Sequence, residues 1–228
     1  MRIDNLIIEV TRQCNMSCEH CLRGDSKKLN ISHEYIDSLL QQVEEIGSVT
    51  FSGGEPTLNL KTLEYFLTEV KRLNIPVTSF YIATNGLVVS EEFVLFCLRM
   101  YAYCYEKEYC RVDISNDMYH AQEGEFDIEL LSGLSFFGRK FEVDEYNYGK
   151  STLINQGRSS EGHSIKSYPI KTMENFNGAY IYLNCKGNII NGCDWSYLNQ
   201  PKHKICEVSE LTTFFNKIEA YELELELA

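Results

Sequence analysis

The sequence predicts an α/β fold built on a mainly parallel sheet, and two observations favour that class. Short apolar segments typical of buried strands alternate with segments whose apolar residues recur at helical spacing, as far as Ser115. Glycine, asparagine and other turn residues separate the two kinds of segment. Strands that alternate with helices form parallel sheets, and right-handed crossovers curl such a sheet into a full or partial barrel.

The composition agrees with one folded domain, with or without a small appendage. Of the 228 residues, 44% are hydrophobic and 24% are charged, which is ordinary globular usage. The formal net charge of -12 repels a phosphate backbone, so we expect no nucleic acid partner. The N-terminus lacks the apolar core of a signal peptide, and no apolar run approaches about 18 residues. We therefore expect a cytoplasmic protein that does not use a membrane.

The first strand and helix flank a long loop. Residues 6–10 are expected to form a buried strand, and residues 11–29 a polar loop that carries cysteines. Ser32 is the expected N-cap of the first helix, whose apolar spacing continues to residue 46 and stops at Gly47.

The next elements repeat this pattern. The expected strands cover residues 48–52, 76–84 and 111–115, and the expected helices cover residues 60–73 and 90–103, the latter opened by Ser90. A Gly-Gly-Glu-Pro turn follows the second strand and Asn85-Gly86 follows the third.

The pattern weakens after the fourth strand. A short helix over 128–134 and strands over 136–143 and 151–155 complete the expected barrel, and residues 179–190 are typical of a hairpin. The prediction is therefore a partial (β/α)6 TIM-like barrel over residues 1–167, with a small C-terminal β-hairpin module over residues 168–228. Its acidic end is expected to be a solvated helix or strand face.

Several polar motifs meet at one rim of this barrel. The loops after parallel strands share the C-terminal edge of the sheet, where barrel folds carry their chemistry. The cysteine loop, the Gly-Gly-Glu-Pro turn, Asn85 and Ser115 all follow strands. We expect them to lie close together.

The cysteine loop has metal-binding spacing. Cys14, Cys18 and Cys21 form a C-x3-C-x2-C run, and thiolates suit zinc or iron–sulfur clusters. Three thiolates leave one iron of a cuboidal cluster without a protein ligand. A zinc site would need a fourth ligand, which His20 could supply. A buried trio without metal is disfavoured because the loop is polar, and disulfides are not expected in the cytosol.

This run, with the aromatic-type His20 before the third cysteine, resembles the radical S-adenosylmethionine (SAM) superfamily over residues 5 to about 158. The stretch 52–56, Ser-Gly-Gly-Glu-Pro, is similar to the second motif of that family. The resemblance implies a [4Fe-4S] cluster on Cys14, Cys18 and Cys21, with SAM on the open iron. It also implies reductive cleavage of SAM to a 5'-deoxyadenosyl radical that abstracts hydrogen from a substrate.

The resemblance suggests which residues bind the cofactor. Gly53 and Gly54 would let backbone groups approach SAM closely, and Glu55 would accept hydrogen bonds from its amine, although a plain turn is the alternative. Ser115 would contact the ribose hydroxyls. The remaining expected cofactor-binding residues are Ser52, His20, Asn85, which could also be an ordinary turn residue, and Arg158, which could pair with the SAM carboxylate or be a surface residue.

The other six cysteines fall into two groups. Cys97, Cys104 and Cys110 are expected to pack in the core. The second group resembles shortened auxiliary-cluster modules, called SPASM or twitch domains, and predicts either a second cluster with a ligand other than cysteine or a vestigial module. Its members are Cys185, Cys193 and Cys206.

The leading functional hypothesis is thus a radical SAM enzyme that modifies a peptide or protein, served by an electron donor such as flavodoxin or ferredoxin. The Gly157-Arg158 pair and the C-terminal module look most like peptide-modifying members of the family. Small-molecule or nucleoside chemistry and glycyl-radical activation are alternatives within enzymes. A non-catalytic iron–sulfur electron carrier or zinc protein is the alternative outside them.

Overall fold

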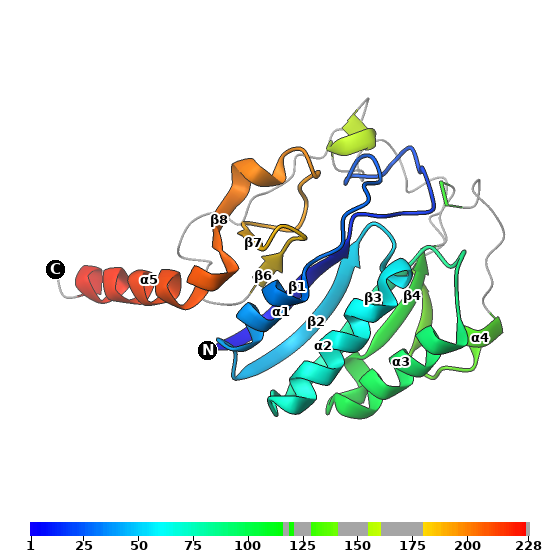
Figure 1. The fold of residues 1–228 in the computed structure, drawn as a ribbon, viewed down its shortest axis with the longest axis horizontal. Helices are drawn as coiled ribbons and strands as arrows, with labels where there is room; N and C mark the ends of the chain where they lie inside the picture. Colours follow the sequence, from blue (N-terminus) through cyan, green and yellow to red (C-terminus); the bar gives the residue numbers. More distant parts are fainter. Residues whose placement is uncertain (116–118, 121–128, 141–154, 161–179, 227–228) are drawn as a thin grey trace.

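The computed structural model describes residues 1–115, 119–120, 129–140, 155–160 and 180–226. Within these ranges the centre of the molecule is one sheet with the strand order β5-β4-β3-β2-β1-β6-β7-β8 (Figure 1). Neighbouring strands from β5 to β6 in this order run parallel, and β7 and β8 are antiparallel additions. The strands are β1 (Arg2–Thr11), β2 (Glu45–Gly53), β3 (Val77–Thr84), β4 (Arg111–Ser115), β5 (Phe137–Lys140), β6 (Tyr180–Leu183), β7 (Asn188–Ile190) and β8 (Lys204–Glu207).

Helices α1, α2 and α3 lie along one face of the sheet (Figure 1). The predicted N-caps are confirmed, because Ser32 Oγ accepts from Glu34 N at 3.3 Å and Ser90 Oγ accepts from Phe93 N at 3.2 Å. No helix in the described ranges is long and apolar enough to cross a membrane. The helices are α1 (His33–Leu40), α2 (Leu60–Arg72), α3 (Glu91–Tyr103), α4 (Glu129–Ser132) and α5 (Leu211–Glu226).

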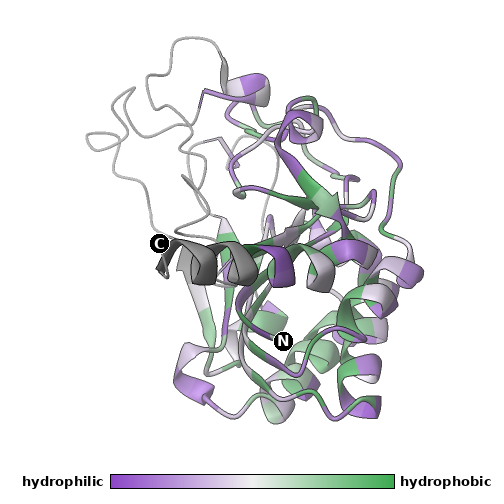
Figure 2. Ribbon diagram, turned by 90° about the vertical axis from the view of Figure 1, so that its left-hand side faces the viewer, coloured by the Kyte–Doolittle hydropathy of each residue, from purple (hydrophilic) through white to green (hydrophobic). Residues whose placement is uncertain are grey.

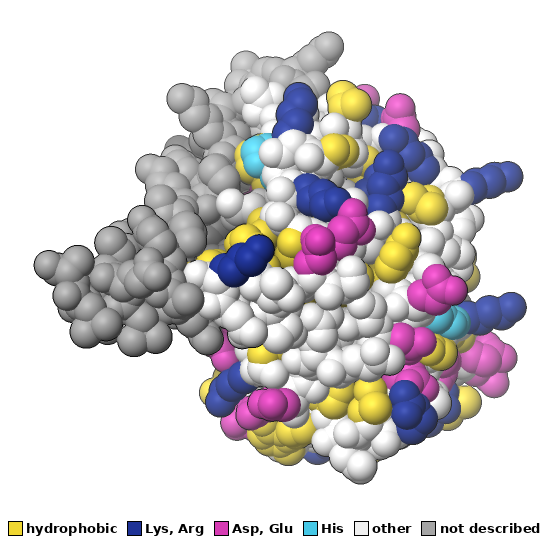
Figure 3. All heavy atoms as spheres, turned by 60° about the vertical axis from the view of Figure 1, so that its left-hand side comes forward, with side chains coloured by type: hydrophobic (Ala, Val, Ile, Leu, Met, Phe, Trp, Pro, Cys, Tyr) yellow, Lys and Arg dark blue, Asp and Glu magenta, His cyan; other side chains and the backbone are white. Residues whose placement is uncertain are grey.

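The two faces of the sheet differ in polarity because side chains alternate along each strand. Towards the helices, Phe51 packs its ring 5.2 Å from that of Phe66 and 5.9 Å from that of Phe96. The opposite face carries polar residues at matching register, such as the pair Glu9 and Ser52. Figure 2 shows the hydrophobic strands inside and the hydrophilic loops outside. On the face turned forward in Figure 3, basic and acidic side chains are interspersed.

The predicted fold class is confirmed as a mixed α/β fold with a mostly parallel sheet, consistent with a partial TIM-like barrel. One helix is shorter than predicted, because α1 ends at Leu40 and Ile46 already pairs with Ile3 as part of β2. The predicted strand over 151–155 and the boundary between residues 167 and 168 involve positions outside the described residues.

The C-terminal hairpin continues the sheet of the barrel. Strand β6 runs parallel to β1, with Ile7 opposite Tyr182, and β7 folds back on it. Strand β8, which the sequence pattern did not predict, and helix α5 extend this part, and α5 includes the acidic end that was expected to form a helix or strand. The hairpin therefore lies directly beside the strand that leads into the cysteine loop.

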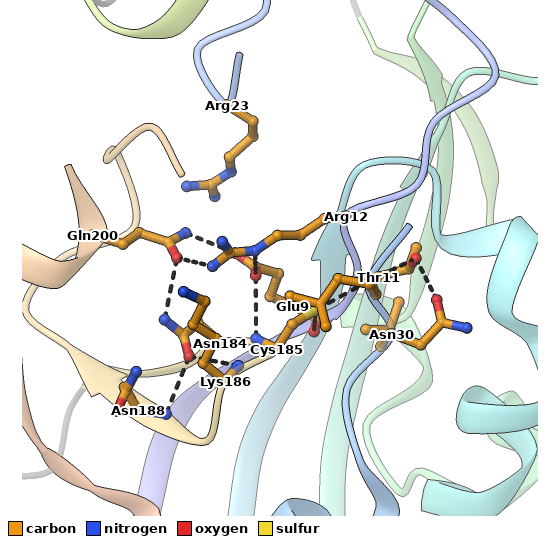
Figure 4. Close-up of polar contacts among 12 residues, drawn as sticks. Glu9, Thr11, Arg12, Arg23, Asn30, Asn184, Cys185, Lys186, Asn188 and Gln200 are labelled. Atoms are coloured by element: carbon orange, nitrogen blue, oxygen red, sulfur yellow. Dashed lines mark hydrogen bonds and ion pairs between the residues drawn. The ribbon is translucent and has the colours of Figure 1, made fainter. Parts of the chain in front are cut away.

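A buried ion pair joins β1 to this C-terminal part (Figure 4). Arg12 Nε donates to Glu9 Oε1 at 2.6 Å, and the side chains are 3% and 0% exposed. The other oxygen of Glu9 accepts from Gln200 Nε2 at 2.6 Å and from Tyr182 Oη at 2.8 Å. Burial alone would raise the pKa of Glu9, but Arg12, Gln200 and Arg23 together lower it. The carboxylate is therefore charged, and both of its oxygen atoms accept hydrogen bonds.

We expect Glu9→Gln to destabilise the protein by about 3 to 5 kcal/mol, because it leaves the Arg12 guanidinium buried without a counter-charge. Equilibrium unfolding in urea measures this loss. The matched control is Glu64→Gln, which breaks an ion pair with Arg99 whose side chains are 29% and 53% exposed and should cost no more than about 1 kcal/mol. Equal losses of unfolding free energy in the two variants would contradict the claim that the buried pair stabilises the protein more than the exposed one.

Candidate functional site

A cavity of about 320 Å³ opens at the C-terminal ends of the parallel strands. It lies against the polar face of the sheet, where Thr50, Ser52 and Tyr81 contribute to its wall. Every residue predicted for the first cluster and for SAM lines this one cavity: Cys14, Cys18, His20, Cys21, Ser52, Gly53, Gly54, Glu55, Asn85, Ser115 and Arg158.

The three thiols of the cysteine loop face a shared environment. Cys18 is buried, whereas Cys14 and Cys21 are partly exposed. Burial raises the pKa of Cys14 to about 11, and Glu55 and the other two thiols add to this effect. The two other thiols therefore oppose the ionisation of Cys14. A bound metal cation would displace their protons and compensate the resulting negative charge.

A second group of donor atoms overlaps the cysteine loop. One donor atom from each of Cys18, His20 and His120 lies within 4.8 Å of the other two. The ring of His20 stacks on Tyr119 with 4.5 Å between centroids, and His120 meets it edge-on at 4.9 Å. His120 was not predicted, because the weak pattern after β4 gave no sign that this segment returns to the cysteine loop.

The Gly-Gly-Glu-Pro turn is bound to the backbone of the cysteine loop. Gly54 N donates to Thr11 O and Glu55 N to Gln13 O, both at 2.8 Å. A Cβ atom on Gly54 would lie 2.1 Å from Gln13 O, and one on Gly53 would lie 2.0 Å from Thr11 O. The glycines are therefore required by the approach of two protein segments. Their predicted closeness to SAM stays a prediction.

The Glu55 side chain links its own turn to the end of β3 beside the cavity. Its side chain is 2% exposed, and it accepts hydrogen bonds from Thr57 Oγ1 at 2.8 Å, Thr84 Oγ1 at 2.7 Å and Asn85 N at 2.7 Å. Burial raises the pKa of this carboxyl group. Glu55 thus has a structural role that the sequence did not indicate. Its predicted contact with the SAM amine remains a prediction.

Asn85 and Ser115 occupy the ends of neighbouring strands. Asn85 Nδ2 donates to Asn15 Oδ1 at 2.7 Å, and its Oδ1 accepts from Leu87 N at 3.1 Å. It therefore links the cysteine loop to the turn after β3. Ser115 is the last residue of β4 and lines the cavity, as a ribose-binding hydroxyl would require.

Arg158 and Gly157 contact the backbone of the cysteine loop. Arg158 Nε donates to Cys18 O at 2.8 Å, and Arg158 N donates to Cys21 O at 3.0 Å. Gly157 has a φ of +58°, and a Cβ there would lie 2.6 Å from Cys21 O. The guanidinium also pairs with Asp25 at 3.2 Å. Pairing of Arg158 with the SAM carboxylate stays a prediction.

Further cavity residues besides His120 were missed by sequence reasoning. Arg12 and Arg23 belong to the cysteine loop, and Arg23 Nη1 donates to Trp195 O at 2.8 Å. Tyr197 comes from the C-terminal part, and the Arg12 guanidinium lies 4.4 Å from its ring centroid. Tyr81, on β3, has its pKa raised to about 12 by burial and by Asp113. The polar stretch 192–197 was the only available signal for Tyr197.

The remaining cysteines pack in apolar clusters. Cys97, Cys104 and Cys110 lie in the main core, as predicted. Cys185 and Cys206 also belong to that core, whereas Cys193 packs against a separate cluster formed by Tyr182, Ile190 and Trp195. Cys185 Sγ donates to Glu9 O at 2.9 Å. Whether Cys185, Cys193 and Cys206 share a second metal cluster or belong to a vestigial module stays a prediction.

Comparison with known proteins agrees with this geometry. The sequence model of the radical SAM superfamily matches residues 8–101. Over residues 8–101 the chain is similar to that superfamily. Protein YfkA of Bacillus subtilis (strain 168) is 37% identical over 71 residues, which are 29% of this chain and 19% of that protein. A protein of Pyrococcus horikoshii named a probable GTP 3',8-cyclase is 32% identical over 89 residues, covering 37% of this chain and 27% of the relative.

The chain spans only 19% and 27% of the length of these two relatives. A solved structure described as "Native anSMEcpe with bound AdoMet and Cp18Cys peptide" superposes on 92% of this chain and 78% of that chain, with a TM-score of 0.59 and 13% identity. At this identity the likeness shows the fold alone.

Radical SAM domains belong to enzymes and bind a [4Fe-4S] cluster and SAM. The residues present fit both groups. Three thiols from one loop line a cavity whose volume lies in the usual range for cofactor sites. The buried hydroxyl of Tyr197 lines the same cavity and has no hydrogen-bond partner among the described residues. Such a group is expected beside a bound ligand.

We expect Gly54→Ala to lower the iron content after anaerobic reconstitution, because the new Cβ would push the cysteine loop away from the turn. Iron and sulfide analysis per chain measures the loss. Gly133→Ala is the matched control, since a Cβ at Gly133 meets nothing within 4 Å. Full iron content in Gly54→Ala would show that the loop tolerates displacement.

Proposed function

We propose that this protein is a radical SAM enzyme that cleaves SAM reductively to generate a 5'-deoxyadenosyl radical. One observation carries the proposal: the three thiols of the cysteine loop and the residues of the SAM motif line a single cavity at the C-terminal ends of the parallel strands. An electron carrier without catalysis would need no such cavity and would close its cluster with a fourth ligand.

A reduced [4Fe-4S] cluster would supply the electron that breaks the carbon–sulfur bond of SAM, giving methionine and the radical. Cys14, Cys18 and Cys21 would hold the cluster and leave one iron for SAM. The turn at 53–55 and Ser115 would orient SAM from the opposite wall. The polar face of the sheet would keep the substrate in one pose and exclude stray hydrogen donors. An external one-electron donor such as flavodoxin or ferredoxin would reduce the site.

The reconstituted protein should bind about four irons per chain and should form 5'-deoxyadenosine from SAM and dithionite. Replacing Cys14, Cys18 and Cys21 together by alanine should abolish the cluster signal in electron paramagnetic resonance and the product in chromatography. Cys193→Ala is the control and should keep both, because Cys193 packs outside the cavity. Cluster-replete protein that yields no 5'-deoxyadenosine would favour the electron carrier.

We further infer that the substrate is a peptide or protein segment. The fold resembles a structure described with a bound peptide, and β8 forms an outer edge of the sheet within the described residues. An extended peptide can pair with such an edge. The net charge of -12 would attract basic peptides over long range, although charges of both signs are mixed on the face in Figure 3.

Deuterium transfer distinguishes peptide substrates from small ones. A labelled basic peptide encoded beside this gene should transfer deuterium into 5'-deoxyadenosine, at a rate that falls as salt rises. Transfer from a nucleoside or other small metabolite alone would overturn the peptide assignment and leave the radical mechanism intact. The partial similarity to a probable GTP 3',8-cyclase makes GTP the first small molecule to compare.

A further inference from the structure

Tyr197 has a buried hydroxyl group that forms no hydrogen bond with any described residue. The residue lies between β7 and β8, is 5% exposed and lines the cofactor cavity. Its Oη atom has no hydrogen-bond partner among the described residues. Buried hydroxyl groups are normally paired, because an unpaired one loses its hydration without compensation. The position beside a cavity points to a ligand as the partner.

The surroundings of Tyr197 hold its ring in place. The Arg12 guanidinium stacks 4.4 Å from the ring centroid, and that guanidinium is itself held by Glu9. The backbone N–H of Tyr197 donates to Arg23 O at 3.1 Å. Burial and the charge of Glu9 raise the pKa of Tyr197. The hydroxyl therefore keeps its proton and is available as a hydrogen-bond donor.

The position of Tyr197 favours the cluster as its acceptor. Its backbone bond to Arg23 places it beside the segment that follows Cys21, and Cys21 lines the same cavity. A [4Fe-4S] cluster on three thiolates carries net negative charge on its sulfur atoms, which accept hydrogen bonds. We propose that the Tyr197 hydroxyl donates a hydrogen bond to a sulfur atom of the cluster and thereby raises its reduction potential. This inference rests on the proposed function.

The direction of the effect follows from charge. One-electron reduction makes the cluster more negative, so a hydrogen-bond donor stabilises the reduced form more than the oxidised form. Tyr197 would then make the cluster easier to reduce by donating a hydrogen bond to it. It would touch neither the substrate nor the carbon–sulfur bond that breaks.

Tyr197→Phe tests this, because it removes only the oxygen atom. In the cluster-free protein the urea unfolding midpoint should stay the same or rise, since no hydrogen bond is lost. In the reconstituted protein the iron content should be unchanged, and the midpoint potential in a redox titration followed by electron paramagnetic resonance should become more negative. SAM affinity should be unchanged.

The matched control is Tyr182→Phe. Tyr182 is equally buried, but its hydroxyl donates to Glu9 Oε2 at 2.8 Å and it does not line the cavity. This variant should lower the unfolding midpoint and leave the reduction potential unchanged. The inference would be overturned if Tyr197→Phe left the reduction potential unchanged, or if it lowered the affinity for SAM and not the potential. Failure of the wild type to take up iron would instead overturn the proposed function.

Discussion

The ion pair between Glu9 and Arg12 is the constraint on which the site depends. It is buried, and a buried charge is tolerated only when its partners are in place. Those partners include Gln200, Tyr182 and the Cys185 amide, all from the C-terminal part. The start of the cysteine loop is therefore attached to residues more than 170 positions away in sequence. Figure 4 shows Glu9 and Arg12 together with Gln200 and Cys185.

The rest of the loop is held mainly through its backbone. Gly54 and Glu55 bind carbonyl groups at its start, whereas Arg158 binds the carbonyl groups of Cys18 and Cys21. These bonds use main-chain atoms of the loop and therefore do not occupy its three thiols. At Gly53 and Gly54 the turn approaches the loop backbone so closely that a larger side chain would clash with it.

Much of this arrangement could be predicted from local patterns. Strand β4 matches its predicted bounds, two N-caps were identified, and the residues expected at the cavity do line it. Local patterns could not show that β6 pairs with β1, because pairing partners distant in sequence leave no periodic signal. Arg12 and Tyr197 were missed for the same reason. Gly53 and Gly54 were expected at the cavity and line it, but their contact with the loop backbone could be seen only in the fold.

The parallel pairing of β6 with β1 has a consequence for biosynthesis. A ribosome delivers the cysteine loop early and residues 180–200 much later, so β1 waits for the neighbour that completes its hydrogen bonds. During that interval Glu9 and Arg12 lack Gln200 and Tyr182, and the thiols of the cysteine loop lie on an incompletely anchored segment. The start of the cysteine loop therefore acquires its full set of contacts only after residues 180–200 have been synthesised.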